Sequence, residues 1–75
     1  MTLFRRFSEA HLRLAEEHVA RGVEIIAAQR RRIERIEAEG GDASSVKETL
    51  GTMERIQTEL VEHRDHVARA VAELT

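Results

Sequence analysis

Apolar side chains recur every three or four residues along almost the whole chain, and one short segment interrupts this spacing. Such a repeat places apolar side chains on one stripe of a helix, as in coiled coils and helical bundles. Proline, which breaks helices, is absent from the 75 residues. The spacing predicts a helix over about 3–39, a turn over about 40–43 and a second helix over about 44–74. The first stripe comprises Leu12, Ala15, Val19, Gly22, Ile26, Gln29, Ile33 and Ile36, and the second comprises Val46, Thr49, Met53, Ile56, Leu60, His63, Val67, Ala70 and Leu74.

The interrupting segment has the residue types of a turn. Gly40 or Gly41 can adopt the left-handed conformation that ends a helix. Asp42 can accept a hydrogen bond from a backbone N–H at the start of the next helix, and Ser45 with Glu48 forms a second capping pattern. A short turn makes the two helices antiparallel neighbours. The predicted fold is therefore all-α, a single domain formed by a coiled-coil-like two-helix hairpin.

The position of the turn also predicts how the helices align. If the turn is centred near Asp42, residues that face each other have numbers adding up to about 85. Gly22 then faces His63 and leaves room for its imidazole, and Ala15 faces Ala70. Small residues opposite one another or opposite larger ones are typical of a specified core.

A two-helix hairpin has a single seam, and this sequence carries apolar side chains outside it. Widened apolar faces are typical of helices with more than one neighbour. Phe4 and Phe7, the two aromatic residues, precede the part of the first helix that has a facing residue at this alignment. We expect a homodimer of hairpins that forms a four-helix bundle, while a different protein partner would satisfy the same surface. The predicted interface residues are Phe4, Phe7, Leu14, Ile25, Leu50, Val61 and Val71.

The composition restricts the classes of function. The chain has no cysteine, which excludes a thiol nucleophile and a cysteine zinc site. It has no glycine-rich phosphate loop, and its paired carboxylates lie on charged helical faces, so we expect no enzyme and no catalytic residue. No apolar run is long enough to span a membrane and the first residues, MTLFRRF, lack a signal-peptide core, so we expect a cytoplasmic protein.

Histidine residues supply one alternative function. His63 and His66 lie three residues apart on one face of the second helix, and the predicted alignment brings His18 near His66. Histidines that project inward from bundle helices can bind zinc or another divalent metal. The alternative is a metal- or pH-responsive bundle that uses His18, His63 and His66. The competing interpretation is that His63 is a packed, neutral core residue and that the chain binds no cofactor.

An arginine cluster near the end of the first helix supplies a second alternative, a small RNA-binding hairpin dimer. Clustered positive charge attracts phosphate groups. However, glutamates interleave the cluster, no aromatic side chain accompanies it, and the formal net charge of the chain is −2, so we expect no nucleic-acid partner. The residues of the cluster are Arg30, Arg31, Arg32 and Arg35.

A pattern over roughly residues 11–66 resembles short, uncharacterised bacterial proteins predicted to be helical hairpins. The residues that carry the resemblance are Ala15 to Gly22, Ile26, Gln29, Arg30, Gly41, Asp42, Leu50, Met53, Glu54, Gln57 and His63 to Asp65. The resemblance implies a stand-alone cytoplasmic hairpin and brings no catalytic residues with it. The leading expectation is a non-enzymatic protein-interaction module, a self-associating hairpin with a scaffold or regulatory role.

Overall fold

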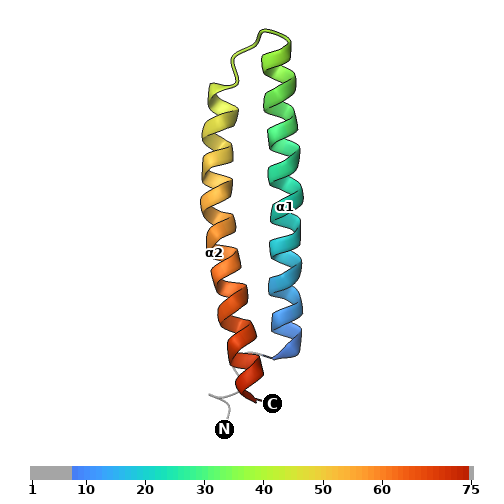
Figure 1. Ribbon diagram of the computed structural model, residues 1–75, viewed down its shortest axis with the longest axis vertical. Helices are drawn as coiled ribbons and strands as arrows, with labels where there is room; N and C mark the ends of the chain where they lie inside the picture. Colours follow the sequence, from blue (N-terminus) through green and yellow to red (C-terminus); the bar gives the residue numbers. More distant parts are fainter. Residues whose placement is uncertain (1–7, 75) are drawn as a thin grey trace.

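The computed structural model describes residues 8–74 and contains two α-helices side by side in one layer (Figure 1). Helix α1 spans Glu9–Ala38 and helix α2 spans Ser44–Leu74. The chain reverses direction between them, so the two helices are antiparallel. Residues 8–74 contain no strand. The all-α two-helix hairpin predicted from the apolar spacing is confirmed.

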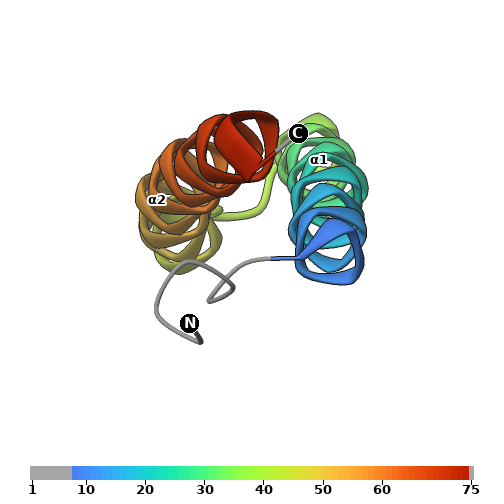
Figure 2. The same cartoon turned by 90° about the horizontal axis from the view of Figure 1, so that it is seen from below.

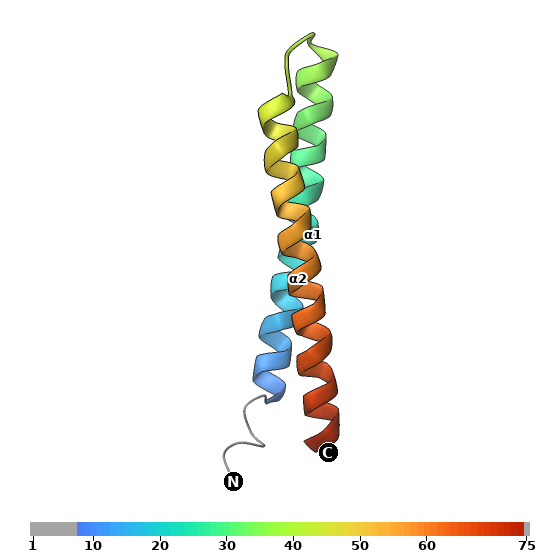
Figure 3. The ribbon, with the colours of Figure 1, turned by 90° about the vertical axis from the view of Figure 1, so that its left-hand side faces the viewer.

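The hairpin is elongated, and within residues 8–74 each helix packs only against the other. It measures 59 × 15 × 14 Å, and its radius of gyration is 17.0 Å. A compact chain of this length has a radius of gyration of about 11 Å. Viewed from the end, the helices lie next to each other, and viewed from the edge, one lies in front of the other (Figures 2 and 3). Neither α1 nor α2 combines the length and the apolar character needed to cross a membrane.

Helix α1 begins at Glu9, later than the start near residue 3 that the apolar spacing predicts. Ser8 has an extended backbone, with φ −117° and ψ 173°, and acts as the N-cap. Its hydroxyl oxygen accepts a hydrogen bond from the backbone N–H of His11 at 3.3 Å, and its own backbone N–H donates to His11 Nδ1 at 3.0 Å. This reciprocal pair is a capping box in which histidine replaces the usual glutamate or glutamine. Residues 3–7 of the predicted helix lie outside the described residues.

Gly40 ends α1 by adopting the left-handed conformation, with φ 77°. The backbone N–H of Gly41 donates to the carbonyl oxygen of Ile36 at 2.8 Å, and that of Gly40 donates to Glu37 at 3.0 Å. These two hydrogen bonds form a Schellman motif, which pairs carbonyl groups that the end of a helix would leave free. The sequence leaves a choice between the two glycines, and the structure assigns the left-handed residue to Gly40.

Asp42 caps the start of α2, as predicted. Its Oδ1 accepts hydrogen bonds from the backbone N–H of Ser44, at 2.9 Å, and from the Ser44 hydroxyl. These hydrogen bonds stabilise the carboxylate and lower the pKa of Asp42. Ala43 is buried next to the seam, and its carbonyl oxygen accepts the first helical hydrogen bond from Lys47. The turn therefore fixes both helix ends through its own backbone and side chains.

The core is a narrow seam, because each helix has only one neighbour. Its buried side chains lie 11 and 7 residues apart in α1 and 4 apart in α2, spacings that keep them on one stripe of each helix. The buried residues are Ala15, Ile26, Ile33, Ala43, Val67 and Val71.

The alignment of the helices differs from the predicted one. Gly22 faces Gln57, and Ile26 and Met53 line the same hollow, so facing residue numbers add up to 79 rather than to about 85. The predicted contact between Gly22 and His63 is therefore wrong. The physical reason lies in the turn, because the residues after Gly40 run back along the last turn of α1 before α2 begins (Figure 1).

Candidate interaction surface

Three hollows lie along one side of the seam and define a surface that we call the hollowed face. The central hollow has a volume of about 330 Å³; a second lies nearer the turn and a third nearer the open end. His18 lines both the central hollow and the one nearer the open end, so these two are contiguous. The hollowed face consists of Leu14, His18, Arg21, Ile25, Gln29 and Arg32 of α1 and Ser45, Thr49, Ile56 and His63 of α2.

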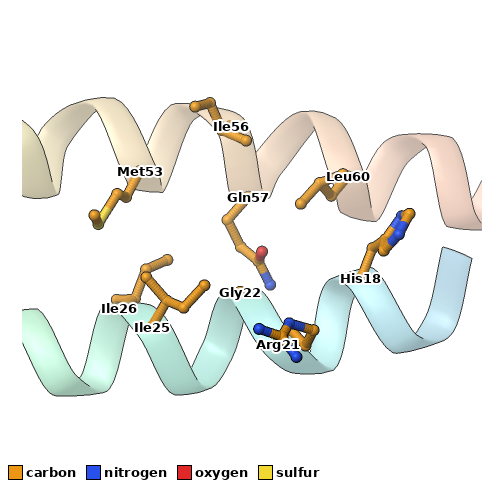
Figure 4. Close-up of a pocket in the computed structure, with 9 residues that line it drawn as sticks. All are labelled: His18, Arg21, Gly22, Ile25, Ile26, Met53, Ile56, Gln57 and Leu60. Carbon is orange, nitrogen blue, oxygen red and sulfur yellow. The ribbon is translucent and has the colours of Figure 1, made fainter.

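Aliphatic side chains form most of the central hollow (Figure 4). Ile26 is buried at the seam, whereas Ile25 and Ile56 are 45% and 49% exposed. Together with Leu14, they are three of the five large apolar side chains that stay exposed in residues 8–74. Burial of such side chains is the main favourable term when proteins associate. The hollowed face is therefore suited to packing against another apolar surface.

A glutamine crosses the seam within this hollow. The side-chain Nε2 of Gln57 donates a hydrogen bond to the backbone carbonyl oxygen of Val19 at 2.9 Å. Its Oε1 is buried without a hydrogen-bond partner, directly over the backbone of Gly22. A Cβ atom at Gly22 would lie 1.8 Å from this oxygen, so only glycine leaves room for the amide (Figure 4). The pair joins the helices near their middle.

The opposite side of the seam is held by ion pairs, and we call it the ion-paired face. Arg30 Nη2 lies 2.7 Å from Glu54 Oε2, and Lys47 Nζ lies 2.7 Å from Glu37 Oε2. The hydrogen bond that Lys47 donates to the Glu37 carboxylate, together with the charge of this carboxylate, raises the pKa of Lys47. The face consists of Val23, Arg30 and Glu37 of α1 and Lys47, Glu54 and Val61 of α2, each set spaced by seven residues.

The structure distributes the predicted interface residues over different environments. Leu14 and Ile25 are exposed on the hollowed face, as an intermolecular contact requires. Leu50 and Val61 are half-buried along the opposite side of the seam. Val71 is buried within the chain, so it is not available to a partner. The other two predicted residues, Phe4 and Phe7, lie outside the described residues.

The histidines predicted to bind metal do not converge as expected. His18 and His63 line the hollow nearer the open end together with His11, whereas His66 is not part of its lining. His63 is exposed rather than packed in the core, because Gln57 takes the place opposite Gly22. Within the described part of the chain, no group of three or more histidines and carboxylates is arranged to hold a metal ion.

The predicted RNA-binding arginines point in several directions around α1. Arg30 pairs with Glu54 across the seam, and Arg32 lines the hollow nearer the turn. Arg31 and Arg35 are exposed. The four residues therefore do not form one continuous basic surface, because consecutive residues of a helix lie on different sides of it.

Gln57 is the residue of this surface that the apolar pattern did not identify. The pattern places Ile56 in the seam, whereas the structure exposes Ile56 and turns Gln57 inward. Gly22 was the one indication in the sequence. Glycine lowers the stability of a helix, so a glycine at a seam position suggests that a close contact there compensates for the loss. The sequence indicated close packing at Gly22, and the shifted alignment decided which residue makes the contact.

Comparisons with protein-family models, with curated proteins and with solved structures find no match to this chain.

Proposed function

We propose that the chain is a non-enzymatic protein-interaction module that self-associates through its hollowed face and forms a four-helix bundle with a scaffold or regulatory role. The observation that carries the proposal is the row of exposed aliphatic side chains around the central hollow. Two hairpins that pack these faces together give each helix a second neighbour. This arrangement satisfies the widened apolar pattern of both helices.

The exposed area of the chain supports the same proposal. Its accessible surface is 5853 Å². A compact monomer of the same mass exposes about 4,700 Å², which leaves an excess of about 1,150 Å². A protein–protein interface of standard size buries about 800 Å² on each partner. One face-to-face contact of standard size would therefore cover about 800 Å² of this excess on each copy, which is the larger part of it.

The lining of the central hollow supports a role in binding rather than in catalysis. The hollow is open along one side, and most of the side chains that line it are apolar, among them Ile25, Ile26, Met53 and Leu60. Aliphatic side chains neither activate a nucleophile nor transfer a proton. They do provide the apolar centre that stable interfaces have.

The two alternative functions have less support from the geometry. Metal binding has His18 and His63 in one hollow but lacks the predicted contribution of His66. For RNA binding, Arg30 is already engaged in an ion pair with Glu54. Neither alternative accounts for the exposed aliphatic side chains.

Sedimentation equilibrium over a range of protein concentrations tests the proposal. We expect a monomer–dimer equilibrium in which the dimer predominates at about 10 μM, an affinity that one standard interface readily supplies. A chain that stays monomeric up to about 1 mM would contradict self-association. If the monomeric chain instead binds a different protein, the hollowed face would be the binding site for that hetero-partner.

A further inference from the structure

The charges that border the hollowed face decide how two copies are oriented, if the chain self-associates as proposed above. Face-to-face packing with two-fold symmetry has two solutions. In one, the turns lie at the same end, so α1 of one copy lies over α2 of the other. In the other, the turns lie at opposite ends, so α1 lies over α1 and α2 lies over α2.

The two helices carry opposite charges along this border. Arg21 and Arg32 of α1 line the central hollow and the hollow nearer the turn. On α2, Glu48 lies three residues after Ser45, and Glu59 lies three residues after Ile56. Residues three apart lie on the same side of a helix, so both glutamates border the hollowed face.

The spacing of these charges matches along the hairpin. Arg21 and Arg32 are separated by 11 residues, and so are Glu48 and Glu59, which is about three helical turns in each case. All four side chains are exposed or at the rim, and none makes an ion pair within the described residues. The four charges are therefore available to a partner.

The alignment of the helices places the opposite charges at equal heights. Facing residues have numbers that add up to 79, and the numbers of Arg21 and Glu59, like those of Arg32 and Glu48, add up to 80. A two-fold axis parallel to the hairpin keeps every residue at its own height. Arg21 of one copy then lies beside Glu59 of the other, and Arg32 beside Glu48. Symmetry repeats both contacts, which gives four ion pairs around the apolar centre.

The opposite orientation brings like charges together. If the central hollows are superimposed with the turns at opposite ends, Arg21 of one copy approaches Arg21 of the other, because this hollow extends from His18 to Ile26 on α1. Glu59 comes near Glu59 of the other copy in the same way, because the hollow extends from Met53 to Leu60 on α2. Like charges across an interface disfavour that arrangement.

We propose that two copies pack hollowed face to hollowed face with their turns at the same end. The contacts of Arg21 with Glu59 and of Arg32 with Glu48 select this orientation. Ile25 of one copy then packs beside Ile56 of the other, because α1 of one copy covers α2 of its partner. The apolar centre supplies affinity, and the charged rim supplies the orientation.

Distances between spin labels in the dimer test the orientation. The chain has no cysteine, so Glu39→Cys near the turn and Glu73→Cys near the open end each attach one label per copy. With the turns together, both variants give label distances below about 35 Å, since neighbouring helices pack about 8–10 Å apart. With the turns apart, the distances approach the 59 Å length of the hairpin. A dimer with long distances overturns the proposed orientation and leaves self-association intact, whereas a monomer overturns both.

Charge reversal tests the four residues themselves. Arg21→Glu with Arg32→Glu replaces four attractive contacts by four repulsive ones, so the dimer dissociation constant rises about 30-fold at low salt. Adding Glu48→Arg and Glu59→Arg restores the affinity, because the signs are exchanged. Arg13→Glu with Arg31→Glu makes the same change of net charge on the outer side of α1 and is the matched control. Failure of the fourfold variant to recover, or an equal loss in the control, overturns the proposed ion pairs.

Discussion

The hollowed face and the ion-paired face border the same seam, yet they complete it in different ways. On the ion-paired face, Arg30 and Lys47 reach across to carboxylates of the other helix, so the charges are satisfied within one chain. On the hollowed face, Ile25 and Ile56 stay exposed beside a hollow. This difference supports our proposal that a partner covers the hollowed face, whereas ion pairs within the chain satisfy the charges of the other face.

Substituting one exposed apolar residue on each face tests this difference most strongly. Ile56→Asp places a charge in the proposed interface twice, once from each copy. Each buried isoleucine contributes about 1.5–3 kcal/mol, so the dimer dissociation constant should rise at least 100-fold, by about 3 kcal/mol or more. Sedimentation equilibrium measures the change, and circular dichroism confirms that the hairpin stays helical.

Val23→Asp is the control on the ion-paired face, because Val23 is 58% exposed and offers a similar apolar side chain. It should leave the dissociation constant within about twofold. Equal effects of the two substitutions would mean that the faces do not differ in the way proposed.

The sequence predicted the elements well because their signals are local. The helix ends at Ala38 and Ser44 follow from Gly40, which adopts the left-handed conformation, and from Asp42, which caps α2. The start of α1 was missed because the apolar spacing continues through residues before Ser8. The signal at Ser8 is a polar cap, which a hydrophobic pattern does not register.

The alignment of the helices was predicted wrongly because it depends on how the turn runs in space. A turn centred near Asp42 gives one alignment, and a chain that returns along α1 before entering α2 gives another. This shift replaced His63 by Gln57 opposite Gly22 and moved Ile56 from the seam to the hollowed face. Of the residues predicted for an interface, Leu14 and Ile25 are exposed on the hollowed face, whereas Val71 is buried in the core.

The contact between Gln57 and Gly22 lies where the two faces meet, and a double-mutant cycle measures its strength. Gln57→Ala removes one hydrogen bond, at a cost of about 1 kcal/mol. Gly22→Ala gains up to about 1 kcal/mol of helix propensity but displaces the amide, so its net effect should lie near zero. In the Gln57→Ala background, the same substitution should stabilise by about 1 kcal/mol. Urea denaturation at one protein concentration measures the free energy of unfolding of the unsubstituted chain, the two single variants and the double variant.

Gly51→Ala is the matched control for this cycle. Gly51 also lies inside a helix, and a Cβ there would meet only the end of the Arg55 side chain at 3.9 Å. The substitution should stabilise by about 0.5–1 kcal/mol in both backgrounds. A coupling between Gly22 and Gln57 no larger than that between Gly51 and Gln57 would show that the buried amide does not fix the alignment.

The smallest expected effect is the pH dependence of the ion-paired face. Glu37 raises the pKa of Lys47 in the folded chain, so this pair stabilises the hairpin below the ordinary lysine pKa of 10.5 and loses its effect as the pH rises through the folded value. Lys47→Gln should therefore lower Tm at about pH 8 and have a smaller effect at about pH 12. Arg30→Gln removes the neighbouring pair with Glu54, and its effect should persist at both pH values because a guanidinium stays charged. If Lys47→Gln lowers Tm equally at both pH values, the Lys47 side chain stabilises the hairpin through packing and not through its charge. The ion-paired face would then differ from the hollowed face by contacts other than charge.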